Sequence, residues 1–160
     1  MKNDNLVTET SSDGGSAEGA KAITVTFPPF LKLVPPVRQL ASRFARLGGY
    51  STKDAFRIET IVDEVCNNAV DHGQSGVESK VEMHMAVDRE KADISVTNQS
   101  DPKKVAVLKE LVGRIGQANH VGNDDRRGRG LALIRMLSSN MDVNITDHGT
   151  SVHVTKLREG

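Results

Sequence analysis

The chain has 160 residues, with 21 Lys and Arg against 21 Asp and Glu, so its formal net charge is zero. That length suits a single domain, and the neutral balance argues against a protein built mainly to bind a nucleic-acid backbone or an anionic membrane. Aromatic residues make up 3% of the chain, too few for a base-stacking surface, and no apolar run approaches the roughly 20 residues of a membrane span. With one cysteine and no secretory signal pattern, the sequence predicts a cytoplasmic protein that contacts neither nucleic acid nor membrane directly.

The first residues of the chain are rich in serine and glycine and almost free of apolar side chains. Such a stretch cannot bury enough surface to offset its ordering entropy, so we expect residues 1–21 to form a flexible N-terminal tail. The folded domain is then expected to span residues 22–160. It begins with a strand in which Ile23, Val25 and Phe27 alternate with other residues.

A first helix is predicted after a proline-rich connection. Pro36 suits the first turn of a helix, apolar residues follow at helical spacing, and Gly48-Gly49 ends the pattern. The outward face of this helix carries Arg38, Arg43 and Arg46. These arginines form either an ordinary solvated face or a docking surface.

A second, longer helix is predicted from about Ser51, a good N-cap residue, to His72, with Gly73 as its C-terminal stop. Because a helix advances about 100° per residue, five apolar residues fall on one stripe, namely Ile58, Ile61, Val62, Val65 and Ala69. We expect this stripe to face the core. Cys66, at the edge of the stripe, is expected to be a packed thiol.

Three polar residues of the same helix gather beside the apolar stripe. Glu64, Asn68 and Asp71 fall within about 60° of one another on the adjacent flank. A carboxylate in that place can be partly desolvated and act as a base, and an amide oxygen suits a hard cation such as Mg²⁺. The alternative is a helix with ordinary polar residues next to its apolar face.

The rest of the chain alternates strands with helices. The pattern predicts a hairpin at 80–96, a helical and then polar segment at 101–128 of the kind that forms lids, a third helix at 131–137, and two closing strands at 141–154. Each predicted strand has one apolar face, which does not suit a sheet covered on both sides. The expected fold class is therefore a two-layer α/β sandwich, with helices on one face of a largely antiparallel sheet.

Two glycines, Gly128 and Gly130, come immediately before the third predicted helix. Glycine lets a backbone approach a ligand closely, and the free amides at a helix N-terminus favour phosphate oxygens. Positive charge is added by the neighbouring Arg126, Arg127 and Arg129. The alternative is a basic loop that touches nucleic acid, which the lack of aromatics and the nearby Asp124 and Asp125 disfavour.

Three short motifs resemble those of one enzyme family. Glu64-x-x-x-Asn68 is similar to the N box of the histidine-kinase-like (GHKL or Bergerat) ATPases. Gly128-Arg129-Gly130-Leu131 resembles their second glycine box, and Gly149-Thr150 resembles their adenine-contacting threonine. The order and spacing are closest to the anti-sigma-factor serine/threonine kinases of bacterial partner-switching systems. The resemblance covers about residues 22–157 and implies the Bergerat ATP-binding fold, with a mostly antiparallel mixed sheet.

The resemblance implies ATP and Mg²⁺ as ligands and gives each polar residue a role. Asn68 would ligate the Mg²⁺ that bridges the ATP phosphates, and Glu64 would be the general base that takes a proton from a serine or threonine hydroxyl on an antagonist protein. Asp71 would line the same side of the pocket, and Thr150 would contact the adenine. The arginines and glycines of residues 126–130 would hold the triphosphate.

One motif departs from the family pattern. The family has an aspartate that accepts a hydrogen bond from the adenine amino group, where this chain has Asn98, and Ser100 replaces the glycine two residues later. An amide oxygen can still accept that bond, but it lacks the charge of a carboxylate. We therefore expect Asn98→Asp to tighten ATP binding by about 1 kcal/mol.

The leading expectation is an ATP-dependent kinase that phosphorylates a small antagonist (anti-anti-sigma) protein and sequesters a sigma factor. One alternative is a degenerate, non-catalytic protein-binding module of the same fold. Another is the detached ATPase domain of a sensor kinase that phosphorylates histidine. A homodimer is a further arrangement that the sequence leaves open.

Overall fold

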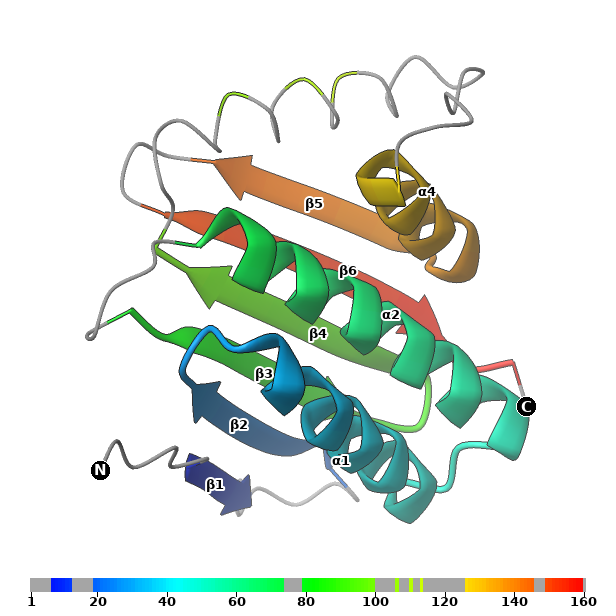
Figure 1. The fold of residues 1–160 in the computed structure, drawn as a ribbon. Helices are drawn as coiled ribbons and strands as arrows, with labels where there is room; N and C mark the ends of the chain where they lie inside the picture. Colours follow the sequence, from blue (N-terminus) through cyan, green and yellow to red (C-terminus); the bar gives the residue numbers. More distant parts are fainter. Residues whose placement is uncertain are drawn as a thin grey trace.

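The structure is a computed structural model that describes residues 7–12, 19–73, 79–99, 126–145 and 149–159, with 106, 110 and 113 as isolated positions. Its elements are β1 (Val7–Ser12), β2 (Lys21–Phe27), the 3-10 helix η1 (Leu31–Leu33), α1 (Val34–Leu47), α2 (Thr52–His72), β3 (Val81–Val87), β4 (Lys91–Asn98), α4 (Arg126–Leu137), β5 (Asn140–Ile145) and β6 (Thr150–Leu157) (Figure 1). The lid predicted at 101–128 lies mostly outside the described residues.

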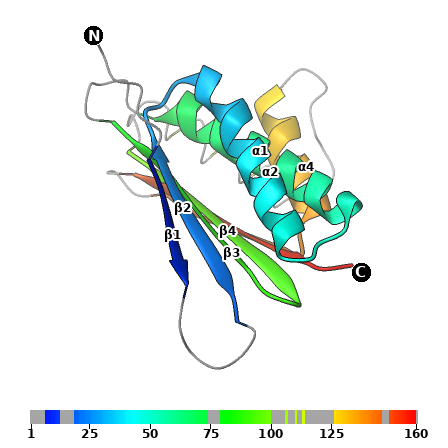
Figure 2. The same ribbon diagram turned by 90° about the horizontal axis from the view of Figure 1, so that it is seen from below.

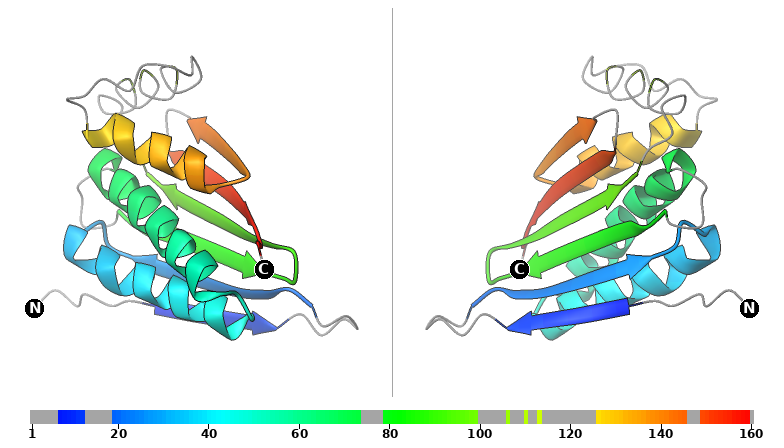
Figure 3. Two further views of the ribbon diagram at one scale, coloured as in Figure 1. Left: turned by 90° about the vertical axis from the view of Figure 1, so that its right-hand side faces the viewer. Right: turned by 90° about the vertical axis from the view of Figure 1, so that its left-hand side faces the viewer.

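The strands form one sheet in the order β1-β2-β3-β4-β6-β5, and every neighbouring pair is antiparallel. The helices α1, α2 and α4 all lie on one face of this sheet (Figures 2 and 3). The predicted two-layer α/β sandwich is therefore confirmed. Among the described strands no parallel pair occurs, so the mixed character implied by the resemblance is not seen in that part of the chain.

The core lies between the sheet and the helices because the strands β2, β3, β4 and β6 each bury every second side chain. In β3, Met83 and Met85 are fully buried while Glu82 and His84 are exposed, as expected for a strand with one dry face. The same alternation runs through β2, β4 and β6. The opposite face of the sheet is consequently polar, and none of the described helices lies on it.

Helix α2 begins and packs as the sequence predicts. The Ser51 hydroxyl oxygen accepts a 3.1 Å hydrogen bond from the backbone N–H of Asp54, which caps the helix. Four members of the predicted stripe are fully buried and Ala69 packs against them from a partly buried position. Cys66 is buried in the same core, and burial raises the pKa of its thiol to about 12.

The N-terminal segment differs from its expected form. Within the predicted tail of residues 1–21, the structure describes Val7–Ser12 as strand β1, paired antiparallel with β2. The segment combines valine with threonines, which suit a strand, and its pairing satisfies the backbone groups along one edge of β2. The first six residues and 13–18 lie outside the described part.

The C-terminal residues hold the beginning of α2 through a buried ion pair. Lys156 at the end of β6 is 2% exposed, and its Nζ lies 3.5 Å from Oδ1 of Asp54, which is 1% exposed. The backbone N–H of Glu159 donates a 3.0 Å hydrogen bond to the other Asp54 oxygen. We call Asp54, Lys156 and Glu159 the C-terminal clamp.

Candidate active site

The polar flank of α2 faces the first turns of α4, and a glycine sets how close the two helices come. A Cβ atom built at Gly130 would overlap Oε2 of Glu64 and would lie 4.0 Å from Nδ2 of Asn68. Any larger residue at this position would therefore push the Glu64 carboxylate away. The predicted pair Glu64 and Asn68 is thus brought together with Gly130, although 66 residues of chain separate Gly130 from Glu64.

Glu64 has the surroundings of a proton acceptor. Its side chain is half-buried, and burial, followed by the charge of Asp63, raises the pKa of its carboxyl above the ordinary value. Within the described residues no cation pairs with Glu64. Asp63, by contrast, accepts a 2.8 Å bond from Nη1 of Arg38. A carboxylate of raised pKa without a partner suits a general base.

Asn68 presents an unsatisfied polar group. Its side chain is 8% exposed, and its Nδ2 has no hydrogen-bond partner among the residues that the structure describes. Leaving a buried donor unpaired costs about 1–3 kcal/mol, so this atom is suited to donate to a ligand. The nearby oxygen atoms, those of the Glu64 carboxylate and of the Asn68 amide, are of the class that binds Mg²⁺. Among the described residues, no three His, Cys, Asp or Glu side chains cluster so that they could hold a metal ion. A metal ion in this part of the site would therefore also need oxygens of a bound ligand.

Beyond Asn68, a small cavity lies between α2, α4 and the sheet. Its volume is about 10 Å³, room for about one water molecule. Ten residues line it, Val65, Asn68, Ala69, His72, Val96, Asn98, Leu131, Val143, Thr150 and Val152. A purine base is much larger than one water, so a nucleotide base can enter only if this cavity widens.

Asn98 is held in one orientation by the end of α2. Its Nδ2 donates a 2.6 Å hydrogen bond to the backbone oxygen of Ala69, which leaves Oδ1 as the acceptor for a ligand. A carboxylate at this position would set an oxygen against that carbonyl oxygen. This geometry therefore argues against the tighter ATP binding expected for Asn98→Asp. The charged aspartate has no hydrogen to donate to the Ala69 oxygen.

The Gly149-Thr150 motif meets Asn98 across the sheet. Thr150 is the register partner of Asn98 in the β4–β6 pair, and both residues are buried. A Cβ atom at Gly149 would lie 2.6 Å from the backbone oxygen of Asn98, so only glycine allows the two backbones to come this close. The predicted threonine is therefore placed at the cavity, next to Asn98.

Helix α4 corrects the predicted position of the glycine motif. It begins at Arg126 rather than at Leu131, so Gly128 and Gly130 lie inside its first turns and not in a loop before it. Only the first four backbone N–H groups of a helix are free, which excludes that of Gly130. The side chains of residues 126–129 lie outside the described part, so the roles of Arg126, Arg127 and Arg129 stay predictions.

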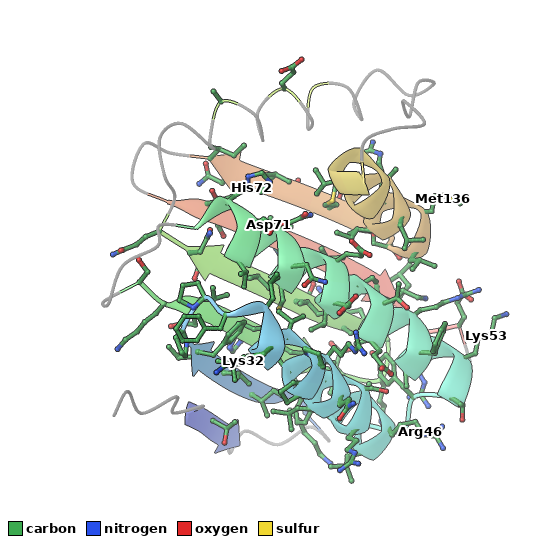
Figure 4. All side chains as sticks on the ribbon, in the orientation of Figure 1. Lys32, Arg46, Lys53, Asp71, His72 and Met136 are labelled. Carbon is green, nitrogen blue, oxygen red and sulfur yellow. The ribbon has the colours of Figure 1, made fainter. Side chains whose placement is uncertain are left out.

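Two further residues complete the picture of the flank. Asp71 is half-buried one turn beyond Asn68 and does not line the cavity. His72 is 1% exposed and does line it, although no chemical role is predicted for it from the sequence. His72 follows Asn68 by four residues, and residues one turn apart share a helix face. This spacing is the sequence signal that places His72 beside Asn68. Figure 4 labels both residues at the C-terminal end of α2.

Comparison with known proteins identifies the family of the fold. No helix among the described residues is long and apolar enough to cross a membrane. A search of curated proteins finds no match to the chain. A family model described as the histidine kinase-like ATPase domain matches residues 27–156, which include Glu64, Asn68, Asn98 and Thr150, and an ATPase domain implies ATP binding. On this match and on the fold, the chain belongs to the family of histidine kinase-like ATPase domains.

Proposed function

We propose that the protein is a cytoplasmic, ATP-dependent serine/threonine kinase of the anti-sigma-factor type. It phosphorylates a small antagonist protein and thereby controls whether a sigma factor is sequestered. The observation that supports this most is the half-buried Glu64 beside the amide of Asn68, both facing α4 at Gly130 and neither side chain paired within the described part of the chain.

In the proposed reaction, Glu64 accepts the proton of the antagonist's serine or threonine hydroxyl as its oxygen attacks the terminal phosphorus of ATP. The bond from that phosphorus to the bridging oxygen breaks, and ADP leaves with the bond electrons. Asn68 would hold Mg²⁺ through its amide oxygen, and the ion would supply charge neutralisation at the phosphates. The free N–H groups at the start of α4 stabilise phosphate oxygens, as helix N-termini do.

At the other end of the nucleotide, the base subsite consists of Asn98 and Thr150. Oδ1 of Asn98 accepts a hydrogen bond from the adenine amino group while its Nδ2 stays on Ala69. This arrangement uses an uncharged acceptor, so base recognition does not depend on the ionisation of an acid.

A second candidate is a non-catalytic binding module that keeps the fold. One observation favours it: the cavity beside Asn98 has room for about one water molecule. A module of this kind would still bind the antagonist or the sigma factor but would not transfer phosphate.

The first experiment separates the two candidates through ATP binding. A ligand at 100 times its Kd stabilises a protein by about 2.7 kcal/mol, so millimolar Mg²⁺-ATP should raise the melting temperature by several degrees. No shift in the melting temperature would remove the kinase proposal and leave the binding module.

The second experiment tests the role of Glu64. In Glu64→Ala the ATP-dependent shift should persist, while phosphate transfer to an antagonist encoded beside the protein should fall by about 10²–10⁴-fold. Asn67→Ala, on the side of α2 that faces away from the buried stripe and outside the cavity lining, is the matched control and should retain transfer. Loss of ATP binding in Glu64→Ala would show that Glu64 holds the nucleotide instead.

A further inference from the structure

The charges of this neutral chain are strongly separated along the sequence. Between residues 19 and 53 there is no Asp or Glu, and the cations are Lys21, Lys32, Arg38, Arg43, Arg46 and Lys53. The whole of this segment lies in the described part, from β2 through α1 to the start of α2. The surface around α1 is therefore basic in a protein whose total charge is zero.

The cations of this segment are used in different ways. Arg38, near the start of α1, is neutralised by Asp63 at 2.8 Å and lies 3.8 Å from Glu59. Lys21 and Arg43 have no ion pair with any described residue. The basic character is consequently strongest at the C-terminal end of α1.

That end of α1 also exposes an apolar side chain. Leu47 is 76% exposed, although most large apolar residues of the domain are buried. It lies one helical turn after the exposed Arg43, so the two side chains share a face of α1, and Arg46 is exposed beside them. Figure 4 labels Arg46 at the end of α1 that lies away from His72.

A cavity opens beside Leu47. Its volume is about 410 Å³, and it is lined by Gly19, Lys21, Leu47, Gly48, Val87, Asp88 and Arg89. The lining contains one carboxylate, Asp88, whose Oδ1 accepts the backbone N–H groups of Glu90 and Lys91. The cavity therefore combines cationic side chains with an apolar wall formed by Leu47 and Val87.

This cavity is separate from the candidate active site. It adjoins the β3–β4 turn, whereas Asn98 is at the other end of β4, seven residues beyond Lys91. At about 3.3 Å per residue, the two ends of that strand are roughly 23 Å apart. A ligand here would not compete with a nucleotide. Lys21, Leu47 and Arg89 line the cavity, and Arg43 and Arg46 are exposed on α1 beside Leu47. We call these five residues the basic pocket.

We propose that the basic pocket docks an acidic segment of a partner protein, with one apolar side chain of that segment packed against Leu47 and Val87. Charge complementarity selects the occupant, because four cations around one carboxylate, Asp88, attract acidic segments and repel basic ones. The cavity takes the apolar anchor, and the surrounding cations pair with flanking Asp or Glu residues. The proposal does not depend on kinase activity, since none of these residues belongs to the candidate active site.

The test is a selection of displayed random dodecapeptides on the full chain at 50 mM salt. The recovered peptides should be enriched in Asp and Glu around one leucine, isoleucine or phenylalanine. Measured by fluorescence polarisation, the best of them should bind about tenfold more weakly to Lys21→Glu/Arg43→Glu and to Leu47→Ser. Raising the salt to 300 mM should weaken binding further, because exposed charges are then screened.

The matched control is Lys80→Glu/Arg135→Glu, which makes the same change in net charge at two exposed positions outside the basic pocket. It should bind the peptides as the unchanged protein does, and all variants should keep the same melting temperature. Recovery of basic or uncharged peptides, equal loss in the control variant, or tighter binding to phosphatidylserine vesicles or single-stranded DNA than to any peptide would overturn the proposal.

Discussion

At the start of α2, Asp54 is buried against Lys156, whereas about three turns further along the same helix Glu64 faces α4 with no described cation beside it. Asn68, one turn beyond Glu64, is buried with an unpaired amide nitrogen. The first region uses buried charge to fix the helix to the end of the chain. The second leaves polar groups for something outside the protein to satisfy, which is typical of a functional site.

The largest expected effect comes from breaking the C-terminal clamp. Lys156→Met leaves the Asp54 carboxylate buried without its cation, and removing one partner of a buried pair costs about 3–5 kcal/mol. Urea denaturation should show this loss in the free energy of unfolding. Lys53→Met, an exposed lysine in the same turn of α2, should change it by less than about 0.5 kcal/mol. Equal effects in both variants would mean that the clamp does not stabilise the fold.

The next largest effect is expected at Gly130, which lies against Glu64. Gly130→Ala should fold, because alanine is a good helix former, but its methyl group must displace the Glu64 carboxylate. A misplacement of about 1 Å can cost about 10²-fold in rate, so phosphate transfer should fall by that order while the melting temperature is kept. Gly113→Ala, where an added Cβ meets nothing within 4 Å, is the control. Unchanged phosphate transfer in Gly130→Ala would show that Glu64 does not act in the reaction.

A smaller effect is expected at the base subsite. Asn98→Asp loses the hydrogen bond to the Ala69 oxygen and should lower stability at pH 7 by about 2 kcal/mol. The introduced carboxyl can donate to that oxygen only when protonated, so its pKa in the folded state is raised. The lost stability should therefore return as the pH falls below that raised pKa, which urea melts at pH 7 and pH 4 can measure. If Asn98→Asp were instead more stable and bound ATP more tightly, the expectation from the sequence would hold and the argument from the Ala69 hydrogen bond would be wrong.

The smallest effect concerns the ionisation of Glu64. Burial and the charge of Asp63 raise the pKa of its carboxyl, so it should become ionised at a higher pH than an exposed glutamate. A base works in the ionised form, and transfer should accordingly rise with pH through this pKa. Carbon-13 NMR titration of the Glu64 carboxyl should show the raised midpoint, and Asp63→Asn should lower it. A midpoint at the ordinary value would contradict the assigned environment.

Much of α2 could be predicted because its signals are local. The cap follows from the side chain of Ser51, and the buried stripe and the flank of Glu64 and Asn68 follow from a period of 3.6 residues. The structure confirms the cap and the stripe. The predicted start of α4 is wrong by five residues, because glycines in the first turn of a helix resemble a loop in the sequence. The strand β1 was not expected, since polar residues at an edge have no periodic signal strong enough to distinguish a strand from a tail.

By itself the sequence determined the fold class, the dry face of each strand and the face of α2 that carries Glu64 and Asn68. Only the tertiary structure decided that Gly130 limits the room around Glu64, that Asn98 donates to Ala69, and that Lys156 neutralises Asp54. The physical reason is the range of the interactions. A helix period is set by neighbours three and four residues apart, whereas these contacts join residues separated by 29 positions or more, and packing alone brings them together.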